Sequence, residues 1–263
     1  MVYQVDYACI SHPGKMHAHN EDNYILGDDF MDFDNDGTHG VITGRLLSDR
    51  APALLAVFDG LSGEEYGEMA AWHGARAIVE YVEKGVESTH RILRHANRVI
   101  CQHAYDSSII ATGTTVNLLR FGPSSITAAN IGNSRTYRIS KGGKERLSED
   151  HTVPVTDGKR APLDQYLGIP SDELTLEPHV ISCPIKLGDL YLLCTDGLSD
   201  YVSEADIASI MRKEAGAEGL ASAAEALFQA AIDAGSEDDI TLIVCRIVEA
   251  PKGIRGLFGH FRK

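Results

Sequence analysis

Leu54-Leu55-Ala56-Val57-Phe58-Asp59-Gly60 is the most informative stretch of this chain. Five consecutive apolar residues that stop at Asp59-Gly60 predict a short strand that is buried on both of its faces. The carboxylate and the glycine come where the strand ends, so we expect them in a turn at the edge of a sheet. The elements on either side of this strand then indicate which kind of fold contains it.

Strands and helices occur in groups along the chain. Two strands are expected before the apolar stretch, at residues 2–10 and 23–26, and the polar residues 27–53 separate them from it. Two helices are expected after it. The first carries apolar residues at spacings of three and four and ends near Gly85, and the second spans residues 88–105.

The second half of the chain is expected to repeat this grouping. Gly122-Pro123-Ser124-Ser125 is typical of a hairpin loop, and Gly188-Asp189 predicts a second hairpin. Residues 140–174 show no convincing periodicity and are expected to form an irregular lobe. The remaining expected elements are strands at residues 114–121, 126–131, 134–139, 180–187 and 190–194, helices at residues 204–213 and 217–234, and a strand at residues 240–247.

Runs of strands with pairs of helices between them do not form βαβ units. The order therefore predicts an α+β protein with antiparallel sheets and with helices layered outside them. We expect residues 1–249 to form a single domain, and residues 250–263 to form a basic, flexible tail.

Composition excludes several classes of protein. The chain has 263 residues, of which 43% are hydrophobic and 24% charged, as in an ordinary globular protein. Its formal net charge of −14 argues against nucleic acid as the main partner. Five scattered cysteines without a C-x-x-C pair are expected to be free thiols in a reducing compartment. We see no signal peptide and no transmembrane segment, so we expect a cytoplasmic protein.

Acidic residues occur at four places where a strand begins or ends. They are Glu21-Asp22, Asp59-Gly60, Asp196-Gly197 and Asp238-Asp239. Carboxylates gathered at one sheet edge repel one another unless cations neutralise them, and Mg²⁺ and Mn²⁺ prefer such oxygen ligands. Any single pair could be an ordinary turn, but four in this context favour a metal site.

Six successive motifs resemble those of the type 2C, metal-dependent protein serine/threonine phosphatases. They are Gly14 with Asn20-Glu21-Asp22, Val57-Phe58-Asp59-Gly60 with Gly63 and Gly67-Glu68, Gly113-Thr114-Thr115, Asn130-Ile131-Gly132-Asn133-Ser134-Arg135, Cys194-Thr195-Asp196-Gly197-Leu198-Ser199-Asp200, and Asp238-Asp239-Ile240-Thr241. The resemblance extends over about residues 2–247. It implies a four-layer α-β-β-α sandwich with two Mn²⁺ or Mg²⁺ ions at one end, and hydrolysis of phosphoserine or phosphothreonine by a water molecule that these ions activate.

The resemblance also implies a role for each matching residue. Asp59 would bridge the two ions, the Gly60 carbonyl would bind one of them, and Asp196 and Asp238 would complete the ligands of the other. Glu21 and Asp22 would hold metal-bound waters. Asp200 would belong to a weaker third metal site beside a flap formed by residues 140–174.

Three positions depart from the family pattern. His17 stands where the family commonly has a phosphate-binding arginine, and Asn133 replaces an aspartate, which should weaken the third metal site. Leu61 stands where eukaryotic members have a histidine and therefore indicates a bacterial origin. His17 is expected to contact the substrate phosphate, unless it faces solvent while Lys15 or Arg135 makes that contact.

These observations predict a bacterial phosphatase that acts as a monomer on phosphorylated proteins and opposes a serine/threonine kinase. Two alternatives stay open. The first is a weakly active pseudophosphatase that binds phosphoproteins as a signalling adaptor, which His17 and Asn133 keep in view. The second is a metal-dependent hydrolase of small phosphate esters.

Overall fold

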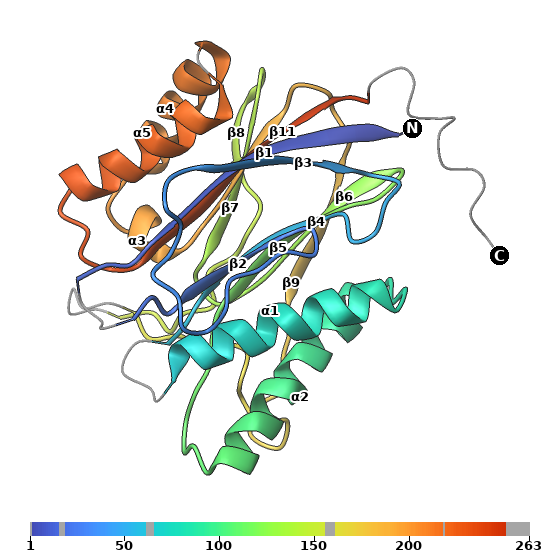
Figure 1. Cartoon of the computed structure of the whole chain (residues 1–263), viewed down its shortest axis with the longest axis vertical. Coiled ribbons are helices and arrows are strands. Elements are labelled where there is room, and N and C mark those ends of the chain that lie inside the picture. The colour runs from blue at the N-terminus through green and yellow to red at the C-terminus, as the bar shows by residue number, and fades with distance from the viewer. Residues whose placement is uncertain (1, 16–18, 62–65, 156–160, 218, 251–263) are drawn as a thin grey trace.

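The protein is built from two antiparallel sheets packed face to face, with helices on both outer faces (Figure 1). The structure is a computed structural model that describes residues 2–15, 19–61, 66–155, 161–217 and 219–250. Within these residues, no helix has both the length and the apolar character needed to cross a membrane. The expected α+β class and the four-layer α-β-β-α arrangement are confirmed.

The six-stranded sheet has the order β3-β1-β11-β10-β7-β8. Its strands are β1 (Tyr3–His12), β3 (Ile42–Leu47), β7 (Arg135–Ser140), β8 (Gly143–Arg146), β10 (Leu190–Cys194) and β11 (Ile240–Glu249). The first and last of these along the chain lie side by side, and all ten residues of β1 pair with β11, from Tyr3 opposite Glu249 to His12 opposite Ile240.

The five-stranded sheet has the order β2-β4-β5-β6-β9. Its strands are β2 (Asp22–Leu26), β4 (Leu54–Asp59), β5 (Val116–Phe121), β6 (Ser125–Ile131) and β9 (His179–Pro184). As expected for an apolar run, Leu54, Val57 and Phe58 on β4 are almost completely inaccessible to solvent.

Two helix pairs cover the outer faces of the sheets (Figure 1). The helices α1 (Gly67–Glu83) and α2 (Thr89–Ser107) pack on the five-stranded sheet, and α4 (Glu204–Ala217) and α5 (Leu220–Asp233) pack on the six-stranded sheet. A short helix, α3 (Asp196–Ser199), follows β10. A third apolar cluster fills the space between the two sheets, so the core has three layers.

The predicted hairpin around Gly188-Asp189 is wrong. The strands on either side of it belong to different sheets, because β9 pairs with β6 whereas β10 pairs with β7 and β11. Gly188 has a φ of 85°, so a turn does occur here, but the chain uses it to pass from one sheet to the other. Sequence reasoning also missed β3 within residues 27–53, β8 within residues 140–174, and α3.

Candidate metal and active site

The layer between the sheets changes from apolar to polar at one end. Val57 of β4 lies in the central core, and Asp59 is two residues further along on the same face. On β2, Tyr24 and Asp22 have the same relation. Strands of the other sheet bring hydroxyl groups to this end, namely Ser11 on β1, Thr195 after β10 and Thr241 on β11. On the faces where the two sheets meet, the apolar core is therefore followed by a polar cluster of Ser11, Asp22, Asp59, Thr195 and Thr241.

Hydrogen bonds within this cluster join the two sheets. The Thr195 hydroxyl donates to Asp22 Oδ2 at 2.9 Å, across the gap between the six-stranded and the five-stranded sheet. The same hydroxyl oxygen accepts the backbone N–H of Thr241 at 3.0 Å. The Oγ of Ser11 and the Oγ1 of Thr241 lie 2.8 Å apart, in hydrogen-bonding distance. The position of Asp22 is therefore set from the opposite sheet.

Two carboxylates face each other across β2 and β4. Asp22 and Asp59 are directly opposite in the strand register and therefore share a face of the sheet. Asp22 is 2% exposed. Burial raises the pKa of Asp22 well above its ordinary value, and repulsion by Asp239 and Asp238 raises it further, against hydrogen bonds from Thr241 and Thr195. This is the electrostatic behaviour expected where carboxylates are gathered for a cation.

Asp239 fixes the segment that carries Glu21. Its Oδ1 accepts the backbone N–H of Gly14 and its Oδ2 accepts the backbone N–H of Glu21, both at 2.7 Å. The segment is held again where Lys15 N–H donates to the Glu237 carbonyl at 2.7 Å. A Cβ atom on Gly14 would come within 2.2 Å of that carbonyl oxygen, so only glycine allows this close approach.

The backbone at Gly60 is packed tightly against two other segments. Its N–H donates to the Glu21 carbonyl at 3.1 Å, and a Cβ at position 60 would lie 2.6 Å from both this oxygen and the Gly67 carbonyl carbon. The preceding residue, Asp59, is held from the other side because its carbonyl accepts the backbone N–H of Thr115 at 2.8 Å and the hydroxyl of Thr114 at 3.0 Å. A glycine is thus required next to Asp59.

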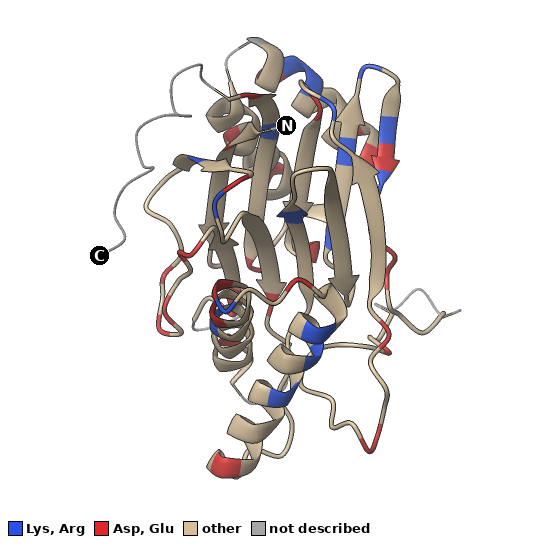
Figure 2. Cartoon of the chain, turned by 90° about the vertical axis from the view of Figure 1, so that its right-hand side faces the viewer, with Lys and Arg blue, Asp and Glu red and all other residues tan. Residues whose placement is uncertain are grey.

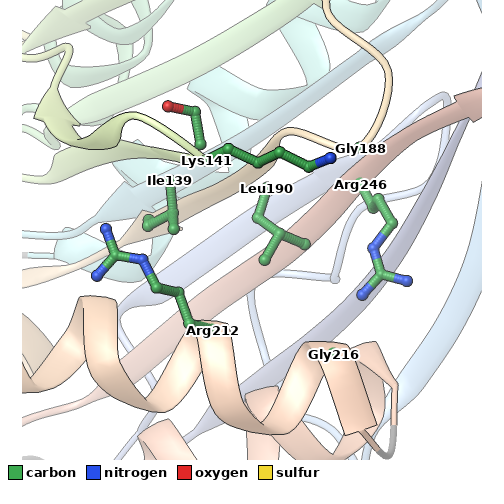
Figure 3. A pocket seen from close by; sticks show the side chains of 8 residues that line it. Ile139, Lys141, Gly188, Leu190, Arg212, Gly216 and Arg246 are labelled. Atoms are coloured by element: carbon green, nitrogen blue, oxygen red, sulfur yellow. The ribbon is translucent and has the colours of Figure 1, made fainter.

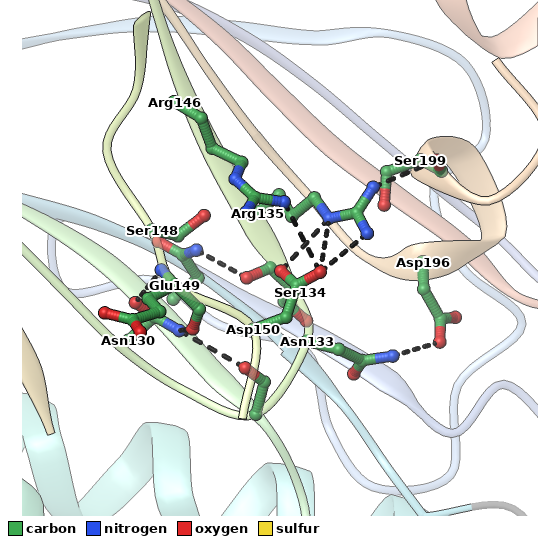
Figure 4. Close-up of polar contacts among 12 residues, drawn as sticks. Asn130, Asn133, Ser134, Arg135, Arg146, Ser148, Glu149, Asp150, Asp196 and Ser199 are labelled. Carbon is green, nitrogen blue, oxygen red and sulfur yellow. Dashed lines mark hydrogen bonds and ion pairs between the residues drawn. The ribbon is translucent and has the colours of Figure 1, made fainter. Parts of the chain in front are cut away.

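Asp196 is buried and accepts a hydrogen bond from Asn133. The Asn133 Nδ2 donates to Asp196 Oδ2 at 2.7 Å (Figure 4). Asp196 begins α3, and the residue after it, Gly197, adjoins Asp239 so closely that a Cβ there would be 2.0 Å from the Asp239 carbonyl oxygen. Asp196 and Asp239 therefore belong to the same assembly, although the neutral amide of Asn133 stands where the family pattern has an acid.

Arg135 is engaged in a structural ion pair. Its Nε lies 3.1 Å from both Asp150 oxygens, its Nη2 lies 2.7 Å from Asp150 Oδ2, and its Nη1 donates to the Ser199 carbonyl at 3.3 Å (Figure 4). Burial alone would lower the pKa of Arg135, but Asp150 and Tyr137 together outweigh this, and the net shift of the pKa is upward. Arg135 thus ties α3 to the segment after β8.

The structure brings most of the predicted site residues to this one end of the sandwich. Asp238 directly precedes Asp239, and its Oδ1 accepts the Asp239 N–H at 3.0 Å. Asp200 stands at the carboxyl end of α3 and is exposed. His17, the predicted phosphate contact, and Gly63 of the second motif lie outside the described residues.

Sequence reasoning missed two parts of the site. It gave no separate role to Asp239, because two adjacent carboxylates before a strand do not reveal which one is turned inward. It also missed the pair of Arg135 and Asp150, which are 15 residues apart and come together only because β7 and the segment after β8 lie side by side.

The donor atoms fit a hard divalent cation. Across the described ranges, no three His, Cys, Asp or Glu side chains are grouped as ready-made ligands of one ion, so the fit rests on the chemistry of the donors. They are carboxylates at the ends of elements from both sheets, together with a glycine backbone, and neither sulfur nor imidazole belongs to the predicted ligand set. Oxygen ligands of this kind select Mg²⁺ or Mn²⁺ over softer ions.

Comparison with known sequences finds a matching family and relatives that are named protein phosphatases. Residues 68–248 match the family described as Stage II sporulation protein E (SpoIIE). The chain is 26% identical over 264 residues to "Serine/threonine protein phosphatase PstP" of Mycobacterium tuberculosis, and 26% identical over 258 residues to "Serine/threonine phosphatase stp" of Listeria innocua. The alignments cover 94% of this chain and 46% of the former, and 88% of this chain and 91% of the latter. The chain thus spans about half the length of the mycobacterial relative.

Solved structures show the same fold. The catalytic domain of the serine/threonine protein phosphatase PstP, in complex with two manganese ions, superimposes with a TM-score of 0.71 at 24% identity, over 95% of this chain and all of that one. The phosphatase Stp1 of Staphylococcus aureus superimposes with a TM-score of 0.72 at 21% identity, over 93% of this chain and 95% of that one. Together with the family match over residues 68–248 and the named relatives, this shared fold confirms the expected resemblance to type 2C phosphatases.

Proposed function

Because the chain belongs to the SpoIIE-type, PP2C-like family, we propose that it is a serine/threonine protein phosphatase that uses Mn²⁺ or Mg²⁺. The observation that carries the proposal is the polar end of the central layer, where Asp22 and Asp59 stand opposite each other and Asp196 and Asp239 adjoin. The names of the mycobacterial and listerial relatives support it, and so do the two manganese ions of the related catalytic domain.

In this proposal Asp59, the Gly60 carbonyl, Asp196 and Asp238 hold two ions, and Asp200 contributes to a weak third site. When bound, such ions neutralise the phosphoryl oxygens and lower the pKa of water, which makes hydrolysis possible at neutral pH. Glu21 and Asp22 orient water at the site, and Thr195 keeps Asp22 in place through its hydrogen bond.

Asp239, Asn133 and Arg135 act as positioning residues. Asp239 holds the backbone of Gly14 and Glu21, Asn133 holds Asp196, and Arg135 joins α3 to Asp150. The likeness to named protein phosphatases favours phosphorylated serine and threonine in proteins as substrates, and hence a serine/threonine kinase as the opposing enzyme. We propose a cytoplasmic, monomeric enzyme with one catalytic domain in residues 1–249.

The test is hydrolysis of a phosphothreonine peptide and of p-nitrophenyl phosphate, with Mn²⁺ and after its removal by a chelator. We expect activity only with the metal, and Asp59→Asn and Asp238→Ala should each lower kcat by at least about 100-fold. The matched control is Asp36→Asn, because Asp36 is an exposed carboxylate in the loop after β2.

Three outcomes separate the alternatives. Full turnover in excess chelator would exclude the metal mechanism. Tight binding of the phosphopeptide without turnover would favour the pseudophosphatase, which the comparisons do not support. Turnover of the small ester alone would favour a hydrolase of small phosphate esters.

A further inference from the structure

A second polar region lies at the other end of the six-stranded sheet. A pocket of about 530 Å³ opens between β7, β10, β11 and α4, and Lys141, Arg212 and Arg246 line it. Leu190 lines this pocket, whereas Asp196 lies six residues further along the chain, a distance of roughly 20 Å at about 3.3 Å per residue. The pocket is therefore separate from the carboxylate cluster.

The three cations come from three different elements. Lys141 follows β7, Arg212 is on α4, and Arg246 is on β11. Figure 3 shows Ile139 and Leu190 between the three cations. Lys141 lies on one side of these two residues and α4 on the other. Arg212 and Arg246 lie at opposite ends of the pocket. The pocket thus has an apolar floor and a basic rim.

No carboxylate neutralises these cations within the part of the chain that the structure describes. The neighbouring Lys144 and Lys213 have acidic partners, since Lys144 Nζ lies 3.2 Å from Glu204 and Lys213 Nζ lies 2.7 Å from Glu214. By contrast, no ion pair joins Lys141, Arg212 or Arg246 to a described carboxylate. This holds in a protein whose formal net charge is −14.

Arg246 has a particular position in this arrangement. It follows Leu242 and Val244 on the face of β11 that packs under the helices, where alternation would place an apolar side chain. Its guanidinium donates to the Ala215 carbonyl, near the end of α4, where a cation is favourable. That contact gives Arg246 a structural role. It leaves Lys141 and Arg212 on the same pocket without a structural role.

Asp6 is the carboxylate closest to Arg246 in the strand register. The two residues are opposite each other on β1 and β11, yet they form no ion pair, and Asp6 instead accepts a hydrogen bond from Gln4. Like charges brought together at a pocket repel one another, and an anion bound between them removes this repulsion.

We propose that this pocket binds a small organic anion with two or more phosphate or carboxylate groups. Lys141, Arg212 and Arg246 bind the anionic groups, and Ile139 and Leu190 contact the body of the molecule. Its volume lies in the range of ordinary small-molecule sites. This site is independent of the phosphatase reaction and does not depend on the proposed function.

The test is calorimetric titration of the metal-free full chain with pyrophosphate and, separately, with citrate. In the metal-free protein the carboxylate cluster repels anions, which leaves the basic pocket as the site under test. We expect saturable binding of at least one probe with a Kd of about 1 mM or lower. The stronger probe identifies whether phosphate or carboxylate is preferred, and the amide resonances of Gly188 and Gly216 should shift during the titration.

Charge-matched variants make the test specific. Lys141→Gln combined with Arg212→Gln should weaken binding at least about tenfold, because two charge-assisted contacts are lost. Lys144→Gln combined with Lys213→Gln removes the same charge from neighbouring positions that do not line the pocket, and should leave binding within about twofold. Equal weakening in both variants, shifts elsewhere than at the pocket, or no saturable binding of either probe would overturn the proposal.

Discussion

At the scale of single residues, the site depends on backbone groups that acidic side chains hold in place. Asp239 accepts two N–H groups from a segment more than 200 residues away in the sequence, and Asn133 satisfies one oxygen of Asp196 with a neutral donor. Each of these two residues thus fixes the position of another residue of the candidate site.

Replacing Asp239 by asparagine should loosen the segment that bears Glu21. An amide offers one oxygen, so one of the two N–H groups of Gly14 and Glu21 would lose its acceptor, at a cost of about 1–3 kcal/mol in the free energy of unfolding. Urea denaturation measures this loss. Glu237→Gln is the control, because position 237 contributes its backbone carbonyl to this contact. Equal stability of the two variants would contradict the positioning role.

Replacing Asn133 by aspartate should exchange stability for metal affinity. A second carboxylate would then face Asp196 Oδ2 at the position of the present 2.7 Å hydrogen bond, and the metal-free protein should lose about 1–3 kcal/mol of unfolding free energy. Calorimetry with Mn²⁺ should detect an additional ion in this variant and not in Asn133→Ala, which removes the donor without adding charge. An unchanged number of bound ions would refute the expectation.

At the scale of elements, the helix pair α1 and α2 contains an unusual buried histidine. His73 of α1 is 9% exposed, its ring lies 4.1 Å from that of His103 on α2, and neither of its ring nitrogens has a hydrogen-bond partner within the described residues. Burial, helped by His103 and Arg76, lowers the pKa of His73 to about 4. The helix pair is therefore packed around a neutral imidazole.

This helix packing should weaken in acid. The pKa of His73 is about 6.5 in the unfolded chain and about 4 in the folded one, so the unfolded state gains a proton first as the pH falls. The contribution to stability is complete above pH 6.5 and is lost between pH 6.5 and 4, by up to about 3 kcal/mol. Urea denaturation at several pH values should show a flatter profile for His73→Leu than for the wild type, whereas His90→Leu, at an exposed position, should keep the wild-type slope.

The elements also show how far sequence reasoning reaches. β4 and α1 could be predicted directly from the sequence. Burial of β4 on both faces leaves a continuous apolar run, and burial of one stripe of α1 leaves apolar residues at helical spacing. β3 and β8 were missed, because half-buried β3 has only Ile42 and Leu46 as apolar residues on its inner face, and the largely exposed β8 has no apolar residue. The connection from β9 to β10 has the local chemistry of a hairpin, and only the pairing of each strand with distant partners reveals that it links two sheets.

The candidate site, too, could be predicted only in part from the sequence. Motifs at strand ends predicted which carboxylates would gather, because strands of a sandwich end at common edges. The partners of these carboxylates could not be predicted, since the contact of Asn133 with Asp196 and that of Thr195 with Asp22 each join segments that are far apart in the sequence.

At the scale of the whole molecule, most charged residues lie outside the three apolar clusters. Figure 2 shows the strands largely without charged residues along their middles, and several acidic residues in the loops where strands end. The five cysteines lie mostly inside the molecule. All are free thiols, four of them are buried, and Cys101 on α2 is half-buried.

Thiol reactivity should distinguish Cys101 from the four buried cysteines. Burial raises the pKa of Cys194 to about 12 and also raises those of Cys9 and Cys245, so these thiols are both inaccessible and protonated at neutral pH. A thiol-specific reagent should modify Cys101 alone in the native protein and all five cysteines in denaturant. Cys101→Ser should abolish the native reaction, and rapid modification of a second thiol in this variant would contradict the buried core.

The pairing of β1 with β11 has a consequence for the order of events during synthesis. The last strand of the five-stranded sheet ends at Pro184, so this sheet and its helices can assemble while the ribosome is still adding residues. β1 can pair with β3 early, but its other edge must wait for β11, because these two strands pair along their full length across more than 200 residues of chain. Asp239 arrives with that last strand. A nascent chain therefore completes the carboxylate cluster only once Asp239 and β11 have been synthesised.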